Sequence, residues 1–315
     1  MKSDFMLADI HMSGYPYPDS ESSVFWNRHG IFVIFPISPG RYRVVADLPA
    51  TSAEHPPDPS LEEVQEVIDQ RGPGGLKAFD PIWLAGFRIN GRKVSSYRWG
   101  RVFLAGDAAH VHSPAGGQGM NTGMQDAFNL SWKLAMVVRQ TCDEHLLESF
   151  SPERSAVGDE VLKAADRLTE IGTMQNPVAQ MARNLVGHLM FGLRPVQHAM
   201  ADTMTEVTIG YPKSPLNGPA LGGSGPKPGE RIVPALGETP VGSGDCPRFA
   251  LFAQKTAGTA DLIERFSVVL DPAIRPPLRE DGIWLARPDG YVACSAREAG
   301  AIAEYLEGLI RPGPR

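Results

Sequence analysis

The sequence is poor in cysteine. Its 315 residues include only Cys142, Cys246 and Cys294, and no CxxC pair occurs. Because three widely spaced cysteines cannot form a paired framework, we expect neither a disulfide scaffold nor a structural zinc site. Long apolar runs are also missing, since the run at residues 31–37 is interrupted by Pro36. That run is far shorter than the roughly 20 residues of a membrane-spanning helix, so no membrane span is expected.

Basic clusters are equally scarce. The chain has 30 Lys and Arg against 36 Asp and Glu, a net charge of −6. This balance argues against nucleic acid or an anionic membrane surface as a partner. The N-terminus carries no apolar signal-peptide core, so the expected location is the cytoplasm. Hydrophobic residues make up 42% and charged residues 21% of the chain, as in ordinary globular proteins of two or three domains.

The first hundred residues predict an antiparallel sheet. Residues 24–26 and 31–35 are apolar strands around the turn Asn27-Arg28-His29-Gly30, and residues 41–46 alternate polar and apolar side chains. One short helix is expected at residues 61–70, and residues 79–98 should return as one or two strands. The expected architecture is a meander with one covered face.

The middle of the chain predicts a strand, a loop and a helix. Residues 102–105 (VFLA) are fully apolar, which is typical of a strand buried on both faces of a parallel sheet. A helix is expected to start near Gly119 or Met120, with Asn121 or Thr122 as its cap. Its polar residues recur at steps of four, three and four, which predicts a mostly buried helix with one narrow polar stripe. The stripe comprises Thr122, Asp126, Asn129 and Lys133.

The C-terminal third predicts a small α/β domain. Residues 213–230 are rich in Gly and Pro and are interpreted as a linker. Strands are expected at residues 249–252, 266–270, 283–286 and 291–294. A closing helix would carry Ile302, Leu306 and Leu309 on one face. The whole chain is therefore α/β (α+β) in class.

Two features of the middle segment carry chemistry. Asp107 follows the apolar strand, and the carboxyl ends of such strands are where open α/β sheets bind ligands. Its carboxylate suits ligand hydroxyls such as those of a ribityl chain, and Gly106 permits close approach to the backbone. Gly116, Gly117 and Gly119 lead into the helix, whose N-terminus forms an anion site. Two alternative interpretations remain. Asp107 could be a turn residue with no ligand, and the three glycines could serve only to let the loop bend.

These residues belong to a longer pattern within residues 101–140. It runs through residues 106–110 (GDAAH), Pro114, residues 116–123 (GGQGMNTG), Asp126 and residues 129–135 (NLSWKLA). This pattern resembles the second FAD motif of the class A flavoprotein monooxygenases, the family of para-hydroxybenzoate, phenol and polyketide hydroxylases. Residues 147–154 (LESFSPER) are similar to the segment that follows this motif in that family.

The resemblance implies a division of the chain. Residues 1–98 would be the substrate-domain sheet, residues 99–212 the distal FAD-binding motif with its helices, and residues 213–230 the linker. Residues 231–315 resemble the thioredoxin-like tail of the longer family members, without redox cysteines. The expected fold is a partial FAD/NAD(P)-binding fold joined to these parts.

The resemblance also implies a cofactor site. Asp107 would hold the FAD ribityl hydroxyls, Pro114 would border the ring, and the backbone of residues 117–121 would contact its pyrimidine end. The full predicted set is Gly106, Asp107, Pro114, Gly116, Gly117, Gln118, Gly119, Met120 and Asn121. The implied reaction is reduction of FAD by NAD(P)H, capture of oxygen and hydroxylation of an aromatic substrate. No catalytic side chain and no metal ligand is predicted.

The sequence departs from the family at one point. The strand–GxGxxG–helix that binds the FAD pyrophosphate is absent, because residues 222–229 (GGSGPKPG) have the wrong spacing and prolines where a helix should begin. The family's middle Asp-Gly motif is absent too. We therefore expect a C-terminal portion of such an enzyme, lacking roughly one dinucleotide-binding domain. Expected partners are a small aromatic substrate and, as open alternatives, a homodimer partner or a separate N-terminal FAD-binding fragment.

Competing interpretations apply to several other residues. His110 and His112 form a metal pair or, in the favoured view, His110 packs or hydrogen-bonds within the loop. Asp126 and Lys133 are interpreted as structural, while Arg92 and Arg98 neutralise cofactor phosphate or are solvated. A further set either packs on the sheet face, the favoured view, or lines a substrate pocket: Trp26, Phe32, Phe35 and Trp83.

The function itself has alternatives. The first is FAD-dependent hydroxylation, and the second is a non-catalytic remnant that acts as a dimerisation or interaction module. A third is a flavoprotein that oxidises its substrate without hydroxylating it. Flavin absorbance separates the second from the others, and peroxide against product formation separates the third.

Overall fold

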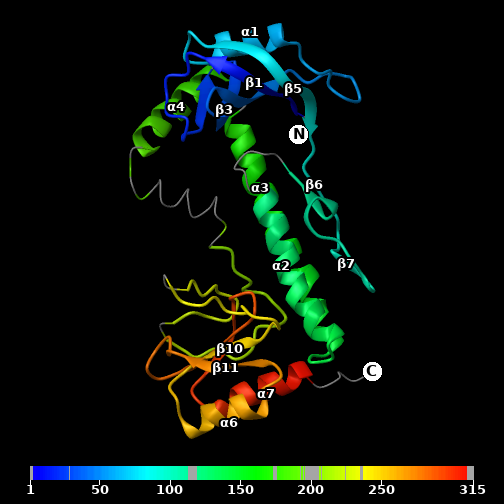
Figure 1. The fold of residues 1–315 in the computed structure, drawn as a ribbon, viewed down its shortest axis with the longest axis vertical. Helices are drawn as coiled ribbons and strands as arrows, with labels where there is room; N and C mark the ends of the chain where they lie inside the picture. The colour runs from blue at the N-terminus through cyan, green and yellow to red at the C-terminus, as the bar shows by residue number, and fades with distance from the viewer. Residues whose placement is uncertain are drawn as a thin grey trace. The chain divides into compact units, whose positions relative to one another are not determined.

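A computed structural model gives the fold, and its chain path is drawn in Figure 1. The residues that it describes are 3–27, 29–112, 119–172, 176–191, 193, 195, 206, 208–223, 225–234 and 237–310. The chain forms two compact units. The first contains residues 1–92, 111–117 and 161–201, and the second contains residues 93–110, 118–160 and 202–315. The predicted functional division into four parts stays a prediction.

The first unit is built on a five-stranded sheet of order β2-β3-β4-β1-β5. All four pairings are antiparallel. The strands are β1 (Ser3–Ser13), β2 (Ser23–Asn27), β3 (Gly30–Ser38), β4 (Arg41–Leu48) and β5 (Lys77–Ile89). The predicted meander is confirmed for β2, β3 and β4. The insertion of β1 between β4 and β5 was not predicted, because it depends on pairing between distant segments.

Helix α1 (Leu61–Arg71) covers the apolar face of this sheet. Ser60 begins it with a capping box, in which the Ser60 side chain accepts from the Glu63 N–H and the Glu63 carboxylate accepts from the Ser60 N–H. Val64 and Ile68 are buried against the sheet core. The predicted helix is thus confirmed, and its spacing of four residues places both side chains on one face.

The predicted parallel strand at residues 102–105 is wrong. Strand β8 (Val102–Phe103) has two residues and pairs antiparallel with β7 (Arg98–Trp99). Val102 is 63% exposed. Within the described residues no strand runs parallel to β8, so its apolar side chains have no sheet to cover them. The neighbouring pair is β6 (Arg92–Lys93) with β9 (His110–Val111).

Helix α2 (Gly119–Val138) begins where it was predicted, but the opposite face is buried. The four residues of the polar stripe are at most 1% exposed. Apolar residues on the other side are exposed by more than half: Met120, Met124, Phe128 and Val138. The expectation of an apolar, mostly buried helix is therefore wrong, because the polar stripe has buried polar partners. Helices α3 (Phe150–Gly172) and α4 (Pro177–Phe191) follow.

The C-terminal part of the second unit has a four-stranded sheet of order β11-β10-β12-β13. Its elements are β10 (Phe249–Phe252), α6 (Ala257–Arg265), β11 (Leu270–Arg275), β12 (Ile283–Ala286), β13 (Val292–Ala296) and α7 (Ala299–Ile310). Strands β10 and β11 are parallel, and the other neighbours are antiparallel. The mixed α/β class is confirmed, and strands β10 and β12 have the predicted bounds.

The strand predicted at residues 266–270 is displaced. Helix α6 ends at Arg265, and the Phe266 N–H donates to the Leu262 carbonyl, so residues 266–269 form the turn before β11. Phe266 and Val269 are buried in the core cluster of this unit. Their apolar side chains therefore reflect packing of a helix end and not a strand.

The described residues of the range 213–230 contain no helix or strand, yet they are tied to β13. The Gly218 N–H donates to the Ala293 carbonyl at 2.9 Å, and the Gly229 N–H donates to the Val292 carbonyl at 2.8 Å. The segment therefore packs as an edge of the small sheet.

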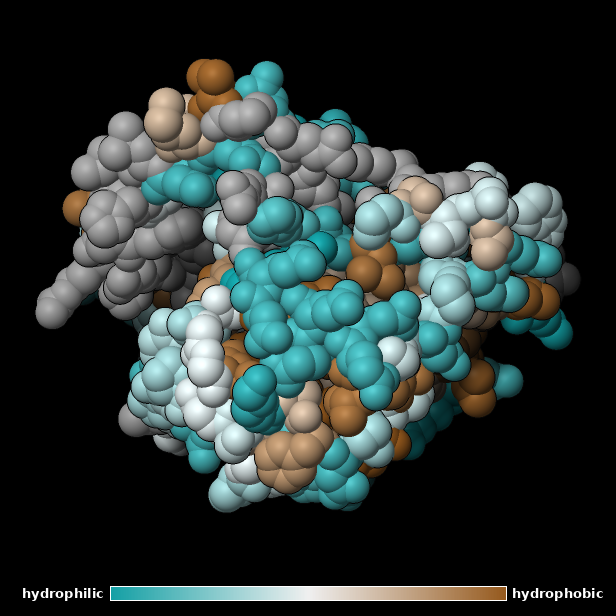
Figure 2. Space-filling model, turned by 90° about the horizontal axis from the view of Figure 1, so that it is seen from above, coloured by the Kyte–Doolittle hydropathy of each residue, from teal (hydrophilic) through white to brown (hydrophobic). Residues whose placement is uncertain are grey.

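Among the described residues no helix is long and apolar enough to cross a membrane. On the face in Figure 2, apolar side chains emerge between hydrophilic ones.

Candidate flavin site

The predicted Asp107 lies on a single turn of 3-10 helix, η1 (Gly106–Ala108). Gly106 has φ +58°, a conformation that glycine adopts without the steric cost of a side chain. Asp107 is exposed, and its carboxylate has no hydrogen-bond partner among the described residues. An exposed carboxylate with its lone pairs available can accept hydrogen bonds from ligand hydroxyls.

The turn is anchored by Asp126, a fully buried carboxylate on α2. Asp126 Oδ2 accepts from the Gly106 N–H at 2.9 Å and lies 2.8 Å from His110 Nε2. Asp126 Oδ1 accepts from Arg154 Nε at 2.6 Å. Burial raises the pKa of Asp126, but the hydrogen bond with His110 and the charge of Arg154 outweigh it, so the pKa is lowered overall. The carboxylate is therefore an anion at neutral pH.

His110 contacts protein groups, as the favoured interpretation expects. Besides its bond to Asp126, its ring stacks on Tyr97 with a centroid distance of 5.9 Å. In the described part of the chain, no group of three or more His, Cys, Asp or Glu side chains could hold a metal ion.

Helix α2 begins with three of the predicted cofactor-binding residues, Gly119, Met120 and Asn121. The helix contacts the turn η1 that carries Gly106 and Asp107. Gly119 is the first described helical residue, and Met120 is 75% exposed. Asn121 and Thr122 lie inside the first turn, so the predicted capping role is wrong for both. Thr122 instead donates its hydroxyl to Glu206 Oε1 at 2.5 Å. The remaining predicted residues lie outside the described residues: Pro114, Gly116, Gly117 and Gln118.

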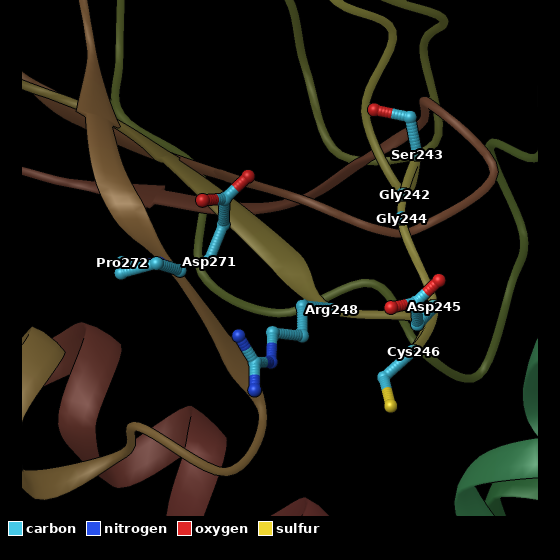
Figure 3. Close-up of a pocket in the computed structure, with 8 residues that line it drawn as sticks. All are labelled: Gly242, Ser243, Gly244, Asp245, Cys246, Arg248, Asp271 and Pro272. Atoms are coloured by element: carbon cyan, nitrogen blue, oxygen red, sulfur yellow. The ribbon is translucent and has the colours of Figure 1, made fainter.

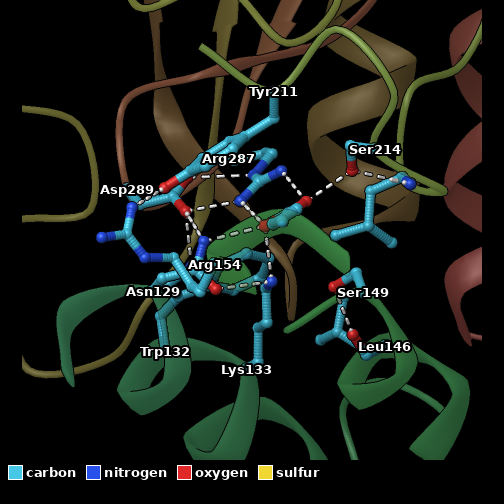
Figure 4. Close-up of polar contacts among 12 residues, drawn as sticks. Asn129, Trp132, Lys133, Leu146, Ser149, Arg154, Tyr211, Ser214, Arg287 and Asp289 are labelled. Atoms are coloured by element: carbon cyan, nitrogen blue, oxygen red, sulfur yellow. Dashed lines mark hydrogen bonds and ion pairs between the residues drawn. The ribbon is translucent and has the colours of Figure 1, made fainter. Parts of the chain in front are cut away.

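A second buried network holds the C-terminal half of α2, around Asn129 and Lys133 (Figure 4). Lys133 Nζ donates to Asn129 Oδ1 and to Glu153 Oε2, both at 2.8 Å. Arg287 donates to both oxygens of Glu153 and to both oxygens of Asp289. Burial lowers the pKa of Lys133 to about 8, although the neighbouring Glu153 charge opposes this shift. All of these groups are buried and paired with one another, and the structural role of Lys133 stays a prediction.

The cavity in Figure 3 lies elsewhere in the second unit. It has a volume of about 300 Å³ and is lined by residues 242–246, Arg248, Asp271 and Pro272. None of the predicted cofactor-binding residues lines it. The described candidate residues therefore lie outside this cavity.

The remaining candidates have mixed outcomes. Arg98 contacts the Gly100 carbonyl and Glu144, so the chain itself supplies its partners. Phe32 is buried in the sheet core, as expected for packing. Phe35 and Trp83 are 41% and 52% exposed, so packing does not fully cover them.

Sequence reasoning missed the role of Asp126. It identified the residue as part of a polar stripe but assigned it no contact to the turn at Gly106. The only available signal was the spacing of four, three and four residues, which places Asp126 between Thr122 and Asn129 on one face. Its partners Gly106 and Arg154 are too far away in the sequence to be paired by pattern.

Comparison with known proteins shows the family of the chain. A family model described as "FAD binding domain" matches residues 5–165, about half of the chain. The chain belongs to this family, and within it to the class A FAD-dependent aromatic monooxygenases. The matched range contains the turn at Gly106 and all of α2.

Individual relatives narrow the comparison. The chain is 35% identical over 256 residues to 6-methylpretetramide 4-monooxygenase of Streptomyces rimosus, covering 70% of this chain and 46% of the relative. It is 42% identical over 175 residues to pentachlorophenol 4-monooxygenase of Sphingobium chlorophenolicum, covering 51% and 31% respectively. The crystal structure of CabE, an aromatic hydroxylase from angucycline biosynthesis, is similar with a TM-score of 0.73 at 26% identity, covering 99% and 65%. The chain thus spans about half the length of the curated relatives it matches, or less.

Proposed function

We propose that this chain carries one wall of the flavin site of an FAD-dependent monooxygenase that hydroxylates a phenolic or polyketide-like aromatic with NAD(P)H as reductant. The observation that carries the proposal is the turn at Gly106. It presents the exposed Asp107 carboxylate beside the start of α2, inside the range that the FAD binding domain model matches. Names of relatives such as 6-methylpretetramide 4-monooxygenase and pentachlorophenol 4-monooxygenase support the substrate class.

The described residues fit two parts of FAD. The Asp107 carboxylate accepts hydrogen bonds, which matches the hydroxyl donors of the ribityl chain. The exposed start of α2 at Gly119 and Met120 offers a positive helix end, which matches the electron-rich pyrimidine edge of a reduced ring. No cation is needed in the pocket for that purpose. We assign the ribityl contact to Asp107 and the ring contact to the segment that ends at Asn121.

Bound FAD would carry electrons from NAD(P)H to O₂ and place one oxygen atom on the aromatic ring. The overall reaction balances as aromatic C–H, O₂, NAD(P)H and a proton giving aromatic C–OH, water and NAD(P)⁺. The chain's own residues bind and orient. Asp107 accepts hydroxyl hydrogen bonds, Asp126 holds the turn, and α2 supplies electrostatic stabilisation without a mobile charge. Because the sequence contains no GxGxxG segment, we assign the FAD pyrophosphate to a separate or additional dinucleotide-binding segment.

The test uses purified protein with FAD, and with riboflavin as a probe that lacks the adenosine and pyrophosphate. Flavin fluorescence and absorbance measure binding. Asp107→Ala should weaken riboflavin affinity about tenfold, because hydrogen bonds to a charged acceptor are lost. Asp261→Ala, an exposed carboxylate change on α6, should leave it unchanged. A colourless protein that binds neither flavin would support the interaction module instead.

Turnover separates the remaining alternatives. With NAD(P)H and a phenolic or polyketide-like aromatic, hydroxylation should incorporate one atom of ¹⁸O₂ into the product. Peroxide in place of the hydroxylated product would favour a flavin oxidase. Supplying a GxGxxG-containing fragment of a relative should raise FAD affinity but leave riboflavin affinity unchanged, because only FAD carries the pyrophosphate.

A further inference from the structure

The buried carboxylate of Asp126 receives donors from three separate segments of the second unit. The Gly106 N–H belongs to the turn, His110 follows it on β9, and Arg154 lies on α3. The side chains of Asp126, His110 and Arg154 are all at most 1% exposed. A buried carboxylate is costly unless it is fully paired, so this residue is held for its contacts.

The geometry fixes which group donates. An ionised carboxylate only accepts hydrogen bonds, so His110 Nε2 carries the hydrogen in the 2.8 Å contact with Asp126 Oδ2. The same oxygen accepts from Gly106, and so the positions of the turn and of His110 depend on one atom. In the sequence, His110 precedes Pro114 by four positions and Gly117 by seven. Asp126 therefore fixes both the start of the turn and the position of the His110 ring.

Backbone contact reinforces the same position. Gly106 and Gly123 face each other: a Cβ added at Gly123 would lie 3.3 Å from Gly106 Cα. The turn thus lies directly on the backbone of α2, one turn of helix before Asp126. Two independent contacts, one polar and one steric, place Asp107 relative to the N-terminus of α2.

We infer that Asp126 is a positioning residue of the flavin site, which acts through the Gly106 N–H and His110 to hold Asp107 in register with the start of α2. This inference rests on the proposed function. Asp126 touches no part of the cofactor in this role. Its removal would therefore leave the binding groups present but misplaced, which costs affinity in the way that loss of an outer-shell partner does.

The first test is Asp126→Asn. The charge of Arg154 draws the Asn oxygen toward itself, which leaves the Asn NH₂ facing the Gly106 N–H. Hydrogen exchange at the Gly106 amide should then accelerate about tenfold or more, as expected for loss of a hydrogen bond to a charged group. This readout needs no flavin. Riboflavin affinity should fall about tenfold with it. Asp261→Asn, on an exposed face of α6, is the matched control and should change neither quantity.

The second test is Gly123→Ala, which changes no charge. Ala favours a helix interior over Gly by about 1 kcal/mol, which offsets part of the steric cost of the added methyl group, so this variant should still fold. Its added methyl group presses on Gly106 Cα and should weaken riboflavin binding severalfold through displacement of the turn. A double variant with Asp107→Asn should lose little beyond Asp107→Asn alone, because both changes act on the same contact.

The outcomes separate the inference from the proposed function. Normal riboflavin affinity in both Asp126→Asn and Gly123→Ala, with Asp107→Ala impaired, would overturn the positioning role and leave the flavin site in place. Unchanged Gly106 exchange in Asp126→Asn would also overturn it. Absence of riboflavin and FAD binding in the wild-type protein would overturn the proposed function itself. Parallel losses in exchange protection and affinity support the inference.

Discussion

Arg287 and Glu153, separated by 134 positions, form a two-pronged ion pair in the interior of the second unit. Arg287 Nη1 donates to Glu153 Oε1 at 2.6 Å, and Nη2 donates to Oε2 at 3.0 Å. Neither side chain is exposed. Ser214 and Lys133 donate to the same carboxylate. Because removal of one partner leaves a buried charge uncompensated, this pair should be among the most sensitive positions in the molecule.

Arg287→Lys tests the geometry of this pair. Lysine keeps the charge but lacks the planar fork that reaches both Glu153 and Asp289, so several charge-assisted hydrogen bonds are lost. The free energy of unfolding of the second unit should fall by about 3 kcal/mol in urea titrations. Arg265→Lys is the control, since its pair with Glu307 is half exposed, and it should cost less than about 1 kcal/mol. Equal losses in the two variants would contradict the assigned role.

Acid should weaken the same network. Burial raises the pKa of Glu153, but the charges of Arg287 and Lys133 outweigh it and hold the pKa well below its ordinary value of 4.5. A group with a depressed folded-state pKa stabilises the fold above its unfolded-state pKa. That stabilisation is lost as the pH falls toward the folded-state pKa. Unfolding free energy measured from about pH 5 downward should therefore decline.

Glu153→Gln provides the comparison for this decline. The variant should be less stable at neutral pH, and its stability should fall less steeply below about pH 5, because one linked proton is removed. Denaturant titrations at several pH values measure both effects. An identical slope in the variant and the wild type would show that other carboxylates account for the acid sensitivity.

Tyr97 offers the opposite kind of change. Its hydroxyl is buried, and among the described residues it has no hydrogen-bond partner. Tyr97→Phe removes an unsatisfied polar group and should raise the unfolding free energy by about 1 kcal/mol. Tyr305→Phe is the contrast, because the Tyr305 hydroxyl donates to the Leu216 carbonyl at 2.7 Å. The unfolding free energy of that variant should fall by about 1 kcal/mol. The melting temperatures of the two variants should therefore shift in opposite directions from that of the wild type.

Helix α2 shows how far sequence reasoning reached. The start of α2 and its stripe of polar residues were predictable from period and composition, because both are local properties. The choice of buried face was not. It depends on Glu153, Arg154 and Glu206, which approach the stripe from distant positions and pair with its polar groups. A polar face can be buried when each of its polar groups has a hydrogen-bond partner. Because these partners are distant in the sequence, the residue pattern of the helix does not reveal them.

The candidate site also has one part that the sequence could predict and one part that it could not. Asp107 and Gly106 could be predicted as candidates because a short motif specifies residue types at fixed spacing. The link from Asp126 to the turn was missed, since hydrogen bonding between a backbone N–H and a side chain 20 positions away has no sequence pattern. The tie between Gly229 and Val292 escaped for a similar reason. Composition showed only that residues 213–230 are rich in Gly and Pro.

Gly229 is where that segment can be tested. Its φ is +86°, and a Cβ there would lie 2.2 Å from the Tyr211 carbonyl oxygen, while its own carbonyl accepts from the Tyr211 N–H. Gly237 has nearly the same φ, +87°, but open space around its Cβ position. Gly237→Ala should therefore cost only the left-handed backbone strain, about 1 kcal/mol. Gly229→Ala adds a clash with backbone that cannot move without breaking the tie to β13, so its loss of unfolding free energy should be clearly larger. Similar losses of unfolding free energy in the two variants, measured by chemical denaturation, would mean that residues 213–230 adjust without cost and behave as a linker.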